Sequence, residues 1–292
     1  MIGSATWTIG GGRVLGPAPF LLAGILNVTP DSFYDGGRHF SPASAVSQGL
    51  ALVEQGAHML DVGGESTRPG AEQVPEAEEF ARVVPVIREL AQAPLREQDG
   101  LPGLFPVIAV DTYKAKVAAA ALEAGALVVN DVSACRFDPA LLDVVAQQKP
   151  GYVLMHSQGE PRTMQADPRY GNVVDDVCAF FEERLGILVK AGLPEEHIAL
   201  DPGIGFGKLL EHNIAILRGI ERFGKFGRPL YMGLSNKALW GKLLGLGPQE
   251  RQRATAVATG LLVARGVLVH RVHEVGLAAQ AARIAAAISP QA

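Results

Sequence analysis

The segment after the first apolar run of this chain carries several side-chain oxygen donors close together. Asn27, Asp31 and Asp35 lie there, with the aromatic Phe33 between the two carboxylates. Such oxygens suit a hard cation such as Mg²⁺, which proteins usually hold with few side chains and with substrate phosphate. Taken alone, the segment is better explained by a turn in which Asn and Asp bond their own backbone. A metal site here therefore needs support from other residues.

Two other segments combine a guanidinium with hydroxyl or imidazole groups, which suits phosphate. The first holds Ser66, Thr67 and Arg68 near glycines, where backbone can approach a ligand closely. Arg presents a planar fork of donors to phosphate, although a solvated turn with a surface Arg is an equal alternative. The second holds Arg271 and His273, which share one side of a strand because alternate strand residues do. A His that titrates near neutral pH can also protonate a departing phosphate.

Four polar residues after other apolar runs suit a flat heterocycle. They are Asp111, Asn130, Asp201 and Lys237. Carboxylates only accept hydrogen bonds, Asn both donates and accepts, and Lys donates, so the set matches a ring such as a 2-amino-pyrimidinone. Each residue alone is explained by a salt bridge or a helix cap. One shared ligand explains the four together more simply.

A glycine-rich segment, DPGIGFGK at residues 201–208, has the composition of a phosphate loop without its pattern. The glycine before the required four-residue spacer is missing, and Leu209 stands where Ser or Thr would bind magnesium. The glycines also lack the spacing of a dinucleotide-binding loop. We predict a tight turn that lets a planar ligand lie against it, with Phe206 available for stacking.

Eight short apolar runs position these residues, and each ends in a polar side chain that a buried strand does not need. The runs span residues 21–26, 59–60, 107–110, 127–129, 152–155, 198–200, 230–234 and 267–269. The residues that end them are Asn27, Asp61, Asp111, Asn130, His156, Asp201, Ser235, and His270 with Arg271. Eight such endings predict parallel strands whose carboxyl ends open onto one polar site.

Helix-like stretches alternate with the runs. They span residues 43–55, 75–91, 114–123, 139–147, 173–191, 210–223, 249–265 and 277–288. Gly56, Gly125 and Gly192 stand where three of these helices should stop. The alternation predicts an α/β fold, a TIM (β/α)8 barrel, with residues 7–20 as a short N-terminal hairpin that covers the barrel bottom. An open doubly wound sheet is the alternative, and it would gather functional residues at one switch point.

Composition and punctuation limit the other classes. The 292 residues are 48% hydrophobic and 19% charged, which is unlike a disordered chain. A net charge of −4 argues against a nucleic-acid partner, which needs a clustered basic face. Cys135 and Cys178 are far apart, no apolar run reaches membrane-span length, and no signal-peptide pattern opens the chain. Residues 91–103 are the most loop-like stretch, and no linker divides the chain. We predict one cytoplasmic domain over residues 1–292, with no membrane partner.

Seven motifs in family order closely resemble those of dihydropteroate synthase. They are GILNVTPDSFYDGG, LDVGGESTRPG, VDTYK, VNDVSA, DPGIGFGK, GLSNK and RVHEV, within about residues 22–275. The resemblance implies a folate-biosynthesis enzyme that joins 6-hydroxymethyl-7,8-dihydropterin diphosphate to p-aminobenzoate and releases pyrophosphate, with Mg²⁺ required. It also implies a homodimer and a target of sulfonamides, which occupy the p-aminobenzoate pocket.

The matched motifs imply a role for each candidate site residue. The metal would be held by Asn27. The pterin would be seated by Asp111, Asn130, Asp201 and Lys237. The diphosphate would be bound by Thr67, Arg68, Arg271 and His273. p-Aminobenzoate would be framed by Phe33, Thr67, Pro69, Phe206, Ser235 and Lys237. Catalysis would involve Asp111, Asp201, Lys237, Arg271 and His273.

This chemistry favours a dissociative, SN1-like displacement. Cations around the diphosphate stabilise charge on the leaving group, while Asp111 and Asp201 favour the cationic pterin-methylene left behind. No strong base is needed, because the attacking arylamine loses its proton readily afterwards. Asn236 departs from the family, which usually has Arg there, and this weakens the prediction around the second substrate.

Two other functions fit part of the pattern. A pterin-dependent methyltransferase shares the Asp and Asn residues but binds no diphosphate, so it needs neither STRPG nor the Arg-x-His segment. A catalytically silent homologue is suggested by Asn236. Such a chain would be expected to lose one of the matched residues Asn27, Arg68, Lys237 or His273, and all four are present.

Overall fold

An eight-stranded parallel sheet forms the centre of the computed structural model, which describes residues 6–29, 42–66, 73–94, 96–98, 101–159 and 163–289. The strand order is β10-β9-β8-β7-β4-β3-β12-β11, and a parallel bridge between Leu200 and Leu230 joins its two ends. The strands are β3 (Leu21–Asn27), β4 (Met59–Gly63), β7 (Val107–Asp111), β8 (Val128–Asp131), β9 (Gly151–Met155), β10 (Ile198–Asp201), β11 (Tyr231–Gly233) and β12 (Val269–Val272). The predicted barrel is confirmed, and the open-sheet alternative is wrong.

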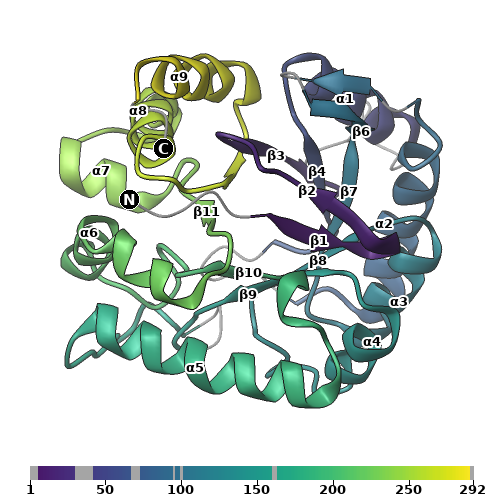
Figure 1. Ribbon diagram of the computed structural model, residues 1–292, viewed down its shortest axis with the longest axis horizontal. Coiled ribbons are helices and arrows are strands. Elements are labelled where there is room, and N and C mark those ends of the chain that lie inside the picture. Colours follow the sequence, from purple (N-terminus) through teal and green to yellow (C-terminus); the bar gives the residue numbers. More distant parts are fainter. Residues whose placement is uncertain are drawn as a thin grey trace.

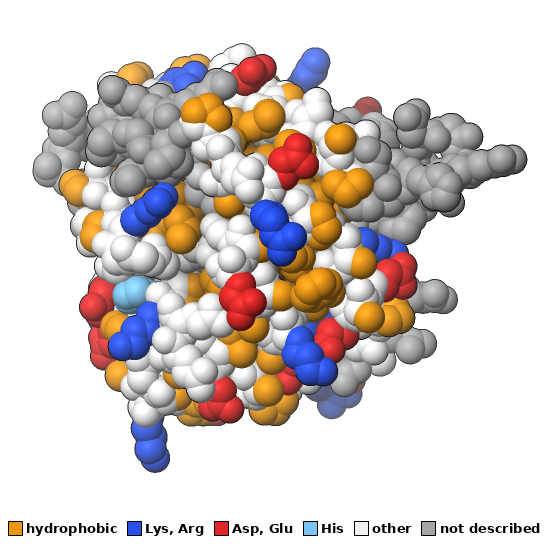
Figure 2. All heavy atoms as spheres, turned by 90° about the vertical axis from the view of Figure 1, so that its right-hand side faces the viewer, with side chains coloured by type: hydrophobic (Ala, Val, Ile, Leu, Met, Phe, Trp, Pro, Cys, Tyr) orange, Lys and Arg blue, Asp and Glu red, His pale blue; other side chains and the backbone are white. Residues whose placement is uncertain are grey.

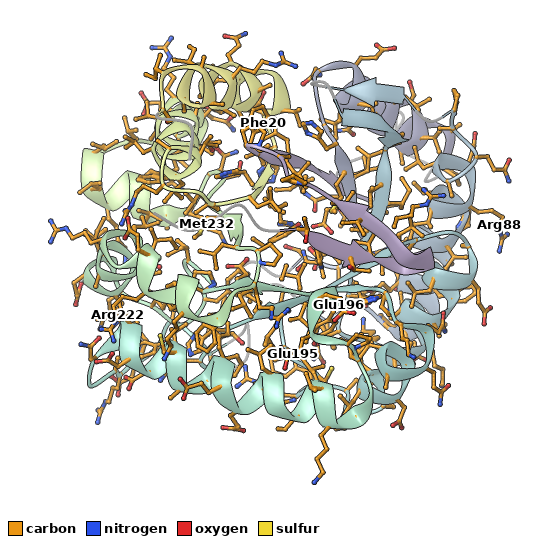
Figure 3. The ribbon with its side chains drawn as sticks, in the orientation of Figure 1. Phe20, Arg88, Glu195, Glu196, Arg222 and Met232 are labelled. Carbon is orange, nitrogen blue, oxygen red and sulfur yellow. The ribbon has the colours of Figure 1, made fainter. Side chains whose placement is uncertain are left out.

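Helices surround this ring, as Figure 1 shows. They are α1 (Pro42–Glu54), α2 (Glu76–Leu90), α3 (Ala115–Glu123), α4 (Leu141–Gln148), α5 (Val173–Ala191), α6 (Leu210–Arg218), α7 (Ala238–Leu244), α8 (Gln252–Val263) and α9 (Val275–Ile288). Gly56, Gly125 and Gly192 follow helices at φ of 112°, 113° and 113°, a conformation that only glycine adopts easily. In Figure 3, Arg88 and Arg222 point outward from opposite sides of the ring. The sequence did not indicate α7, which is too short to show a helical period.

The N-terminal hairpin covers the bottom of the barrel, as predicted. It consists of β1 (Trp7–Ile9) and β2 (Arg13–Leu15), which pair antiparallel around the 3-10 turn η1 (Gly10–Gly12). Trp7 and Ile9 are fully buried against residues at the amino ends of the strands, among them Val128 and Val269. The indole of Trp7 donates a 2.8 Å hydrogen bond to the carbonyl of His197. The hairpin crosses the near end of the barrel in Figure 1. The polar site therefore lies at the opposite end.

The prediction of a loop at residues 91–103 is wrong in part. The strands β5 (Arg96–Gln98) and β6 (Leu101–Phe105) pair antiparallel there. Their sequence lacks strict alternation, and their register is irregular between Arg96 and Gln98, so no strand signal was visible. Figure 2 shows that both signs of charge are interspersed with hydrophobic side chains on one face of the molecule. In the part of the chain that the structure describes, no helix is long and apolar enough to span a membrane.

Candidate active site

The carboxyl ends of the barrel strands surround a pocket of about 330 Å³. Six residues of the predicted site line it, namely Asp111, Asn130, Asp201, Phe206, Lys237 and Arg271. The other lining residues are Val132, Met155, Ile204 and Gly233. The lining thus combines charged groups with apolar side chains, which suits a flat heterocycle with polar edges.

Arg271 of β12 forms the electrostatic centre of this pocket. Its Nε donates to Asp61, and its Nη2 donates to Asp111 Oδ2 at 2.5 Å. Asp61 also accepts from Asn130 Nδ2 at 3.0 Å. Asp61 is fully buried and bonds two residues of the predicted site, Asn130 and Arg271, so we count it as part of the site. A carboxylate orients the guanidinium and the carboxamide before a ligand arrives.

Asp61 was predicted only as the polar residue that ends the second apolar run. In the structure β4 continues to Gly63, and Asp61 lies in its middle, flanked by the apolar Leu60 and Val62. A charged residue inside a buried strand was the available signal, because burial of a carboxylate requires a partner.

Burial shifts the two carboxyls that face the pocket toward their neutral forms. It raises the pKa of Asp111 to about 7, although the nearby Arg271 opposes this rise. It raises the pKa of Asp201 to about 6, although the N–H of Gly203 and the lysines Lys237 and Lys208 oppose it. A ligand with N–H donors or positive charge would restore the ionised forms. The pocket is therefore matched to a donor-rich or cationic ligand.

Lys237 stands beside the glycine-rich turn after β10. Its Nζ lies 4.1 Å from the centroid of the Phe206 ring, which is a cation–π distance. The preceding residue, Asn236, has φ of 55°. Asn tolerates this left-handed conformation better than most residues, which gives a local reason for the departure from the family's usual Arg. The N–H of Asn236 donates to Thr255 Oγ1 at 3.3 Å.

His273 and Ser235 contact each other across β12 and β11. Ser235 Oγ lies 2.8 Å from His273 Nδ1 and accepts from the His273 N–H at 3.1 Å. His270 points away from the pocket, and its Nε2 lies 3.0 Å from the carbonyl of Val267. His273 and Ser235 are not among the residues that line the pocket. Cys135 and Cys178 are free and buried.

Asn27 ends β3, half-buried and opposite Gly63 of β4. Its carboxamide oxygen is of the kind that hard cations such as Mg²⁺ accept as a ligand. The described residues contain no cluster of three His, Cys, Asp or Glu side chains that could hold a metal by itself. Four predicted site residues, Phe33, Thr67, Arg68 and Pro69, lie outside the described residues, as do Asp31 and Asp35.

Sequence reasoning also missed a second polar cluster, which consists of Glu65, Val74, Glu79, Tyr113 and Lys114; we call it the Glu65 cluster. Lys114 Nζ donates to Glu65 Oε2 and to the Val74 carbonyl at 2.6 Å each, and also to Glu79. The Val74 N–H donates to Glu65 Oε2 at 3.0 Å. Lys114 thus binds two residues that lie nine positions apart in the chain, Glu65 and Val74.

Comparisons with known proteins agree with this geometry. Residues 23–273 match the family model described as "Pterin binding enzyme". A dihydropteroate synthase from Synechocystis sp. is 42% identical over 91% of this chain and 89% of its own length. A dihydropteroate synthase structure from Xanthomonas albilineans with 4-aminobenzoic acid has a TM-score of 0.85 at 40% identity, covering 98% of both chains. One from Burkholderia cenocepacia, complexed with 7,8-dihydropteroate, has a TM-score of 0.84 at 35% identity, covering 97% of this chain and 96% of its own. By sequence and by structure, the chain belongs to the dihydropteroate synthase family of pterin-binding enzymes.

Proposed function

We propose that this protein condenses 6-hydroxymethyl-7,8-dihydropterin diphosphate with p-aminobenzoate to give 7,8-dihydropteroate and pyrophosphate. The observation that carries the proposal is the convergence of Asp111, Asn130, Asp201, Lys237 and Arg271 on one pocket. Relatives supply independent support, since solved family members hold 4-aminobenzoic acid or 7,8-dihydropteroate. The single-domain organisation and the cytoplasmic location remain predictions.

The pterin is seated by groups whose hydrogen-bonding capacities complement its edges. Asp201 and Asp111 accept from ring N–H and amino groups, and Asn130 both donates and accepts. Because their carboxyl pKa values are raised, ligand N–H groups and positive charge on the ring draw both toward the ionised form. Asp61 holds Asn130 and Arg271 in place from below, as a positioning residue.

Departure of the diphosphate breaks the carbon–oxygen bond, and the electron pair leaves with the diphosphate. Arg271 and His273 lie at the end of β12, where their donors stabilise that charge. Residues 67 and 68 of the second loop are proposed to add a hydroxyl and a guanidinium. Asn27 would hold Mg²⁺ with substrate oxygens, which fits its carboxamide oxygen at the carboxyl end of β3 and the few protein ligands that Mg²⁺ needs. When bound, this ion supplies charge neutralisation for the leaving group.

The arylamine is proposed to bind after the pterin, beside Phe206, Ser235 and Lys237. Phe33, Thr67 and Pro69 complete this proposed pocket. The amine lone pair forms a carbon–nitrogen bond with the pterin methylene cation, and the amine proton then passes to solvent. The sequence of bond breaking before bond making predicts that labelled pyrophosphate exchanges into the pterin substrate without p-aminobenzoate. Failure to see any such exchange would contradict the dissociative order.

A homodimer is proposed from the exposed face of α8 and α9. These helices lie side by side in Figure 1, and a groove of about 900 Å³ runs between them. Val257, Leu261, Ile284 and Ile288 line it and are 62–79% exposed, an apolar surface that a second copy of the chain would cover. Sedimentation of the Leu261→Glu variant tests this, since a charge at the centre of the interface should yield monomers.

The proposed activity is tested by incubating the protein with the pterin diphosphate, p-aminobenzoate and Mg²⁺, then measuring pyrophosphate and dihydropteroate. Equal amounts of both products are expected. Pyrophosphate without dihydropteroate would indicate hydrolysis of the diphosphate alone. Tight pterin binding with neither product would favour a silent homologue, and methyl transfer from a methylated pterin would favour the methyltransferase.

A further inference from the structure

The turn formed by residues 203–208, between β10 and α6, lies directly against the segment after β9. A Cβ built on Gly203 would lie only 1.9 Å from the carbonyl oxygen of His156, so no side chain fits there. Gly203 also has φ of 68°, which favours glycine. Tyr170 fixes the other end of the turn by donating to the Gly207 carbonyl at 2.8 Å. The turn is therefore held at both ends by neighbouring residues.

Lys208 occupies the inside of this turn instead of pointing to solvent. Its Nζ lies 2.9 Å from the Gly203 carbonyl, 3.0 Å from the Phe206 carbonyl and 2.9 Å from His156 Nδ1. The His156 carbonyl lies 3.3 Å away as a fourth and longer contact, so acceptors are present for all three protons of the ammonium. Burial and the charge of Lys208 lower the pKa of His156 to about 2, so its imidazole is neutral and Nδ1 is an acceptor.

Two of the carbonyls that Lys208 binds, those of Gly203 and Phe206, belong to the two ends of a single reverse turn. The Phe206 N–H donates to the Gly203 carbonyl at 3.1 Å, and the ammonium contacts that same carbonyl and the one on Phe206. Phe206 is thereby fixed through both of its own backbone polar groups. Its ring lines the pocket and lies under Lys237 Nζ.

Lys208 itself does not reach the pocket. It is 3% exposed and is not among the lining residues. Its ammonium is committed to acceptors of the turn, so it is not placed to exchange a proton with a substrate. Any effect on the reaction must pass through the groups that it holds.

We propose that Lys208 is a positioning residue that sets the Phe206 ring, and with it the Lys237 ammonium, to receive the arylamine. This inference rests on the proposed function. The buried ammonium acts as an internal clamp on carbonyl groups, and the ring that it orients forms one face of the second-substrate site. A displaced ring would weaken arylamine binding more than pterin binding, because the pterin contacts come mainly from β7, β8, β10 and β12.

A double-mutant cycle tests this coupling. Lys208→Met should raise KM for p-aminobenzoate about tenfold, a change of about 1.4 kcal/mol, with a smaller change in kcat. In a Phe206→Ala background, where the ring is already absent, the same substitution should change KM by less than about twofold. Lys242→Met, at an exposed lysine of α7, is the matched control and should leave KM unchanged.

A purely structural role would give equal increases in KM in both backgrounds, and that result would overturn the proposal. A folded Lys208→Met enzyme with unchanged KM would do so too. Lys208→Gln, which retains two donors, replaces Lys208→Met if the latter does not fold, and should give an intermediate KM.

Hydrogen exchange of residues 203–208 gives a readout that does not depend on turnover. The amides of this turn should exchange faster in Lys208→Met than in the parent protein, and unchanged protection would overturn the clamp. If the parent protein made no dihydropteroate, the proposed function would fail, while this exchange measurement would still decide whether Lys208 holds the turn.

Discussion

Two buried lysines follow different strands of the barrel, and their ammonium groups are satisfied in opposite ways. Lys114, after β7, contacts the carboxylates of Glu65 and Glu79 in the Glu65 cluster. Lys208, after β10, contacts carbonyls of the 203–208 turn and the neutral imidazole of His156. Both are nearly inaccessible, with exposed fractions of 9% and 3%. The charge of Lys114 is thus balanced by carboxylates, whereas the charge of Lys208 is stabilised by hydrogen bonds to uncharged acceptors.

This difference separates two ways of building a loop beside a substrate pocket. Charge balance makes the Glu65 cluster interdependent. Loss of Lys114 would leave two buried carboxylates without the cation that pairs with them in the part of the chain that the structure describes. The partners of Lys208 are uncharged, so loss of its ammonium should lower the stability of the 203–208 turn by less, because only uncharged carbonyls lose a donor. It also leaves Lys208 able to lose its proton near neutral pH, since burial lowers its pKa to about 7.

The largest expected effect is that of Lys114→Met. Removal of the ammonium takes from the buried Glu65 and Glu79 the one cation that pairs with them among the described residues, which should lower the free energy of unfolding by about 3–5 kcal/mol. Urea unfolding followed by circular dichroism measures this loss. Lys116→Met is the control, because Lys116 is 82% exposed and its contact with Glu76 is screened by solvent. A loss under about 1 kcal/mol for Lys114→Met would show that the cluster is not charge-balanced.

Lys208→Met should be less costly. The methionine side chain fills similar space. The substitution removes a buried charge and takes the Lys208 donor from the carbonyls of Gly203 and Phe206, although the Gly203 carbonyl keeps the Phe206 N–H. We expect the free energy of unfolding to fall by about 1–3 kcal/mol. The same urea series compares the two variants directly. If Lys208→Met lost as much unfolding free energy as Lys114→Met, or more, the charge of the acceptors would not explain how the two lysines differ.

Two tyrosines allow a matched comparison of the same two regions. Tyr113 donates to the Glu65 carboxylate at 3.1 Å, and Tyr170 donates to the Gly207 carbonyl at 2.8 Å. Hydrogen bonds to charged groups are stronger, so Tyr113→Phe should cost about 1.5–3 kcal/mol and Tyr170→Phe about 0.5–1.5 kcal/mol. Thermal unfolding of both variants measures the order. The reverse order would mean that the shorter distance matters more than the charge of the acceptor.

Much of the pocket could be predicted from the sequence, whereas the supports behind it could not. Polar residues at strand ends must converge in a parallel barrel, so Asp111, Asn130 and Asp201 followed from periodicity alone. The partners of Lys114 and Lys208 depend on which loops meet after folding, and no local spacing encodes that. Lys208 and His156 are 52 positions apart in the chain. Asp61 was overlooked for the same reason, because its importance comes from Arg271, 210 positions later.

The last expected effect is a pH dependence of the contribution that Lys208 makes to stability. Its pKa is about 7 in the folded protein and 10.5 ordinarily, because burial disfavours the ammonium. Between those values the unfolded chain binds more protons, so the contribution of Lys208 to the free energy of unfolding rises with pH. The rise cannot exceed about 1.4 kcal/mol per pH unit.

The measurement is the difference in unfolding free energy between the parent protein and Lys208→Met, taken from about pH 7 to about pH 9.5. Asp201, Lys237 and Arg136 act on Lys208 electrostatically, but they are present in both proteins, so most of their own titration cancels in the difference. The difference should grow with pH, whereas that for Lys242→Met should stay flat. Parallel curves for Lys208→Met and the parent would mean that the clamp keeps its proton throughout. Its dipolar partners would then stabilise the ammonium as fully as carboxylates do.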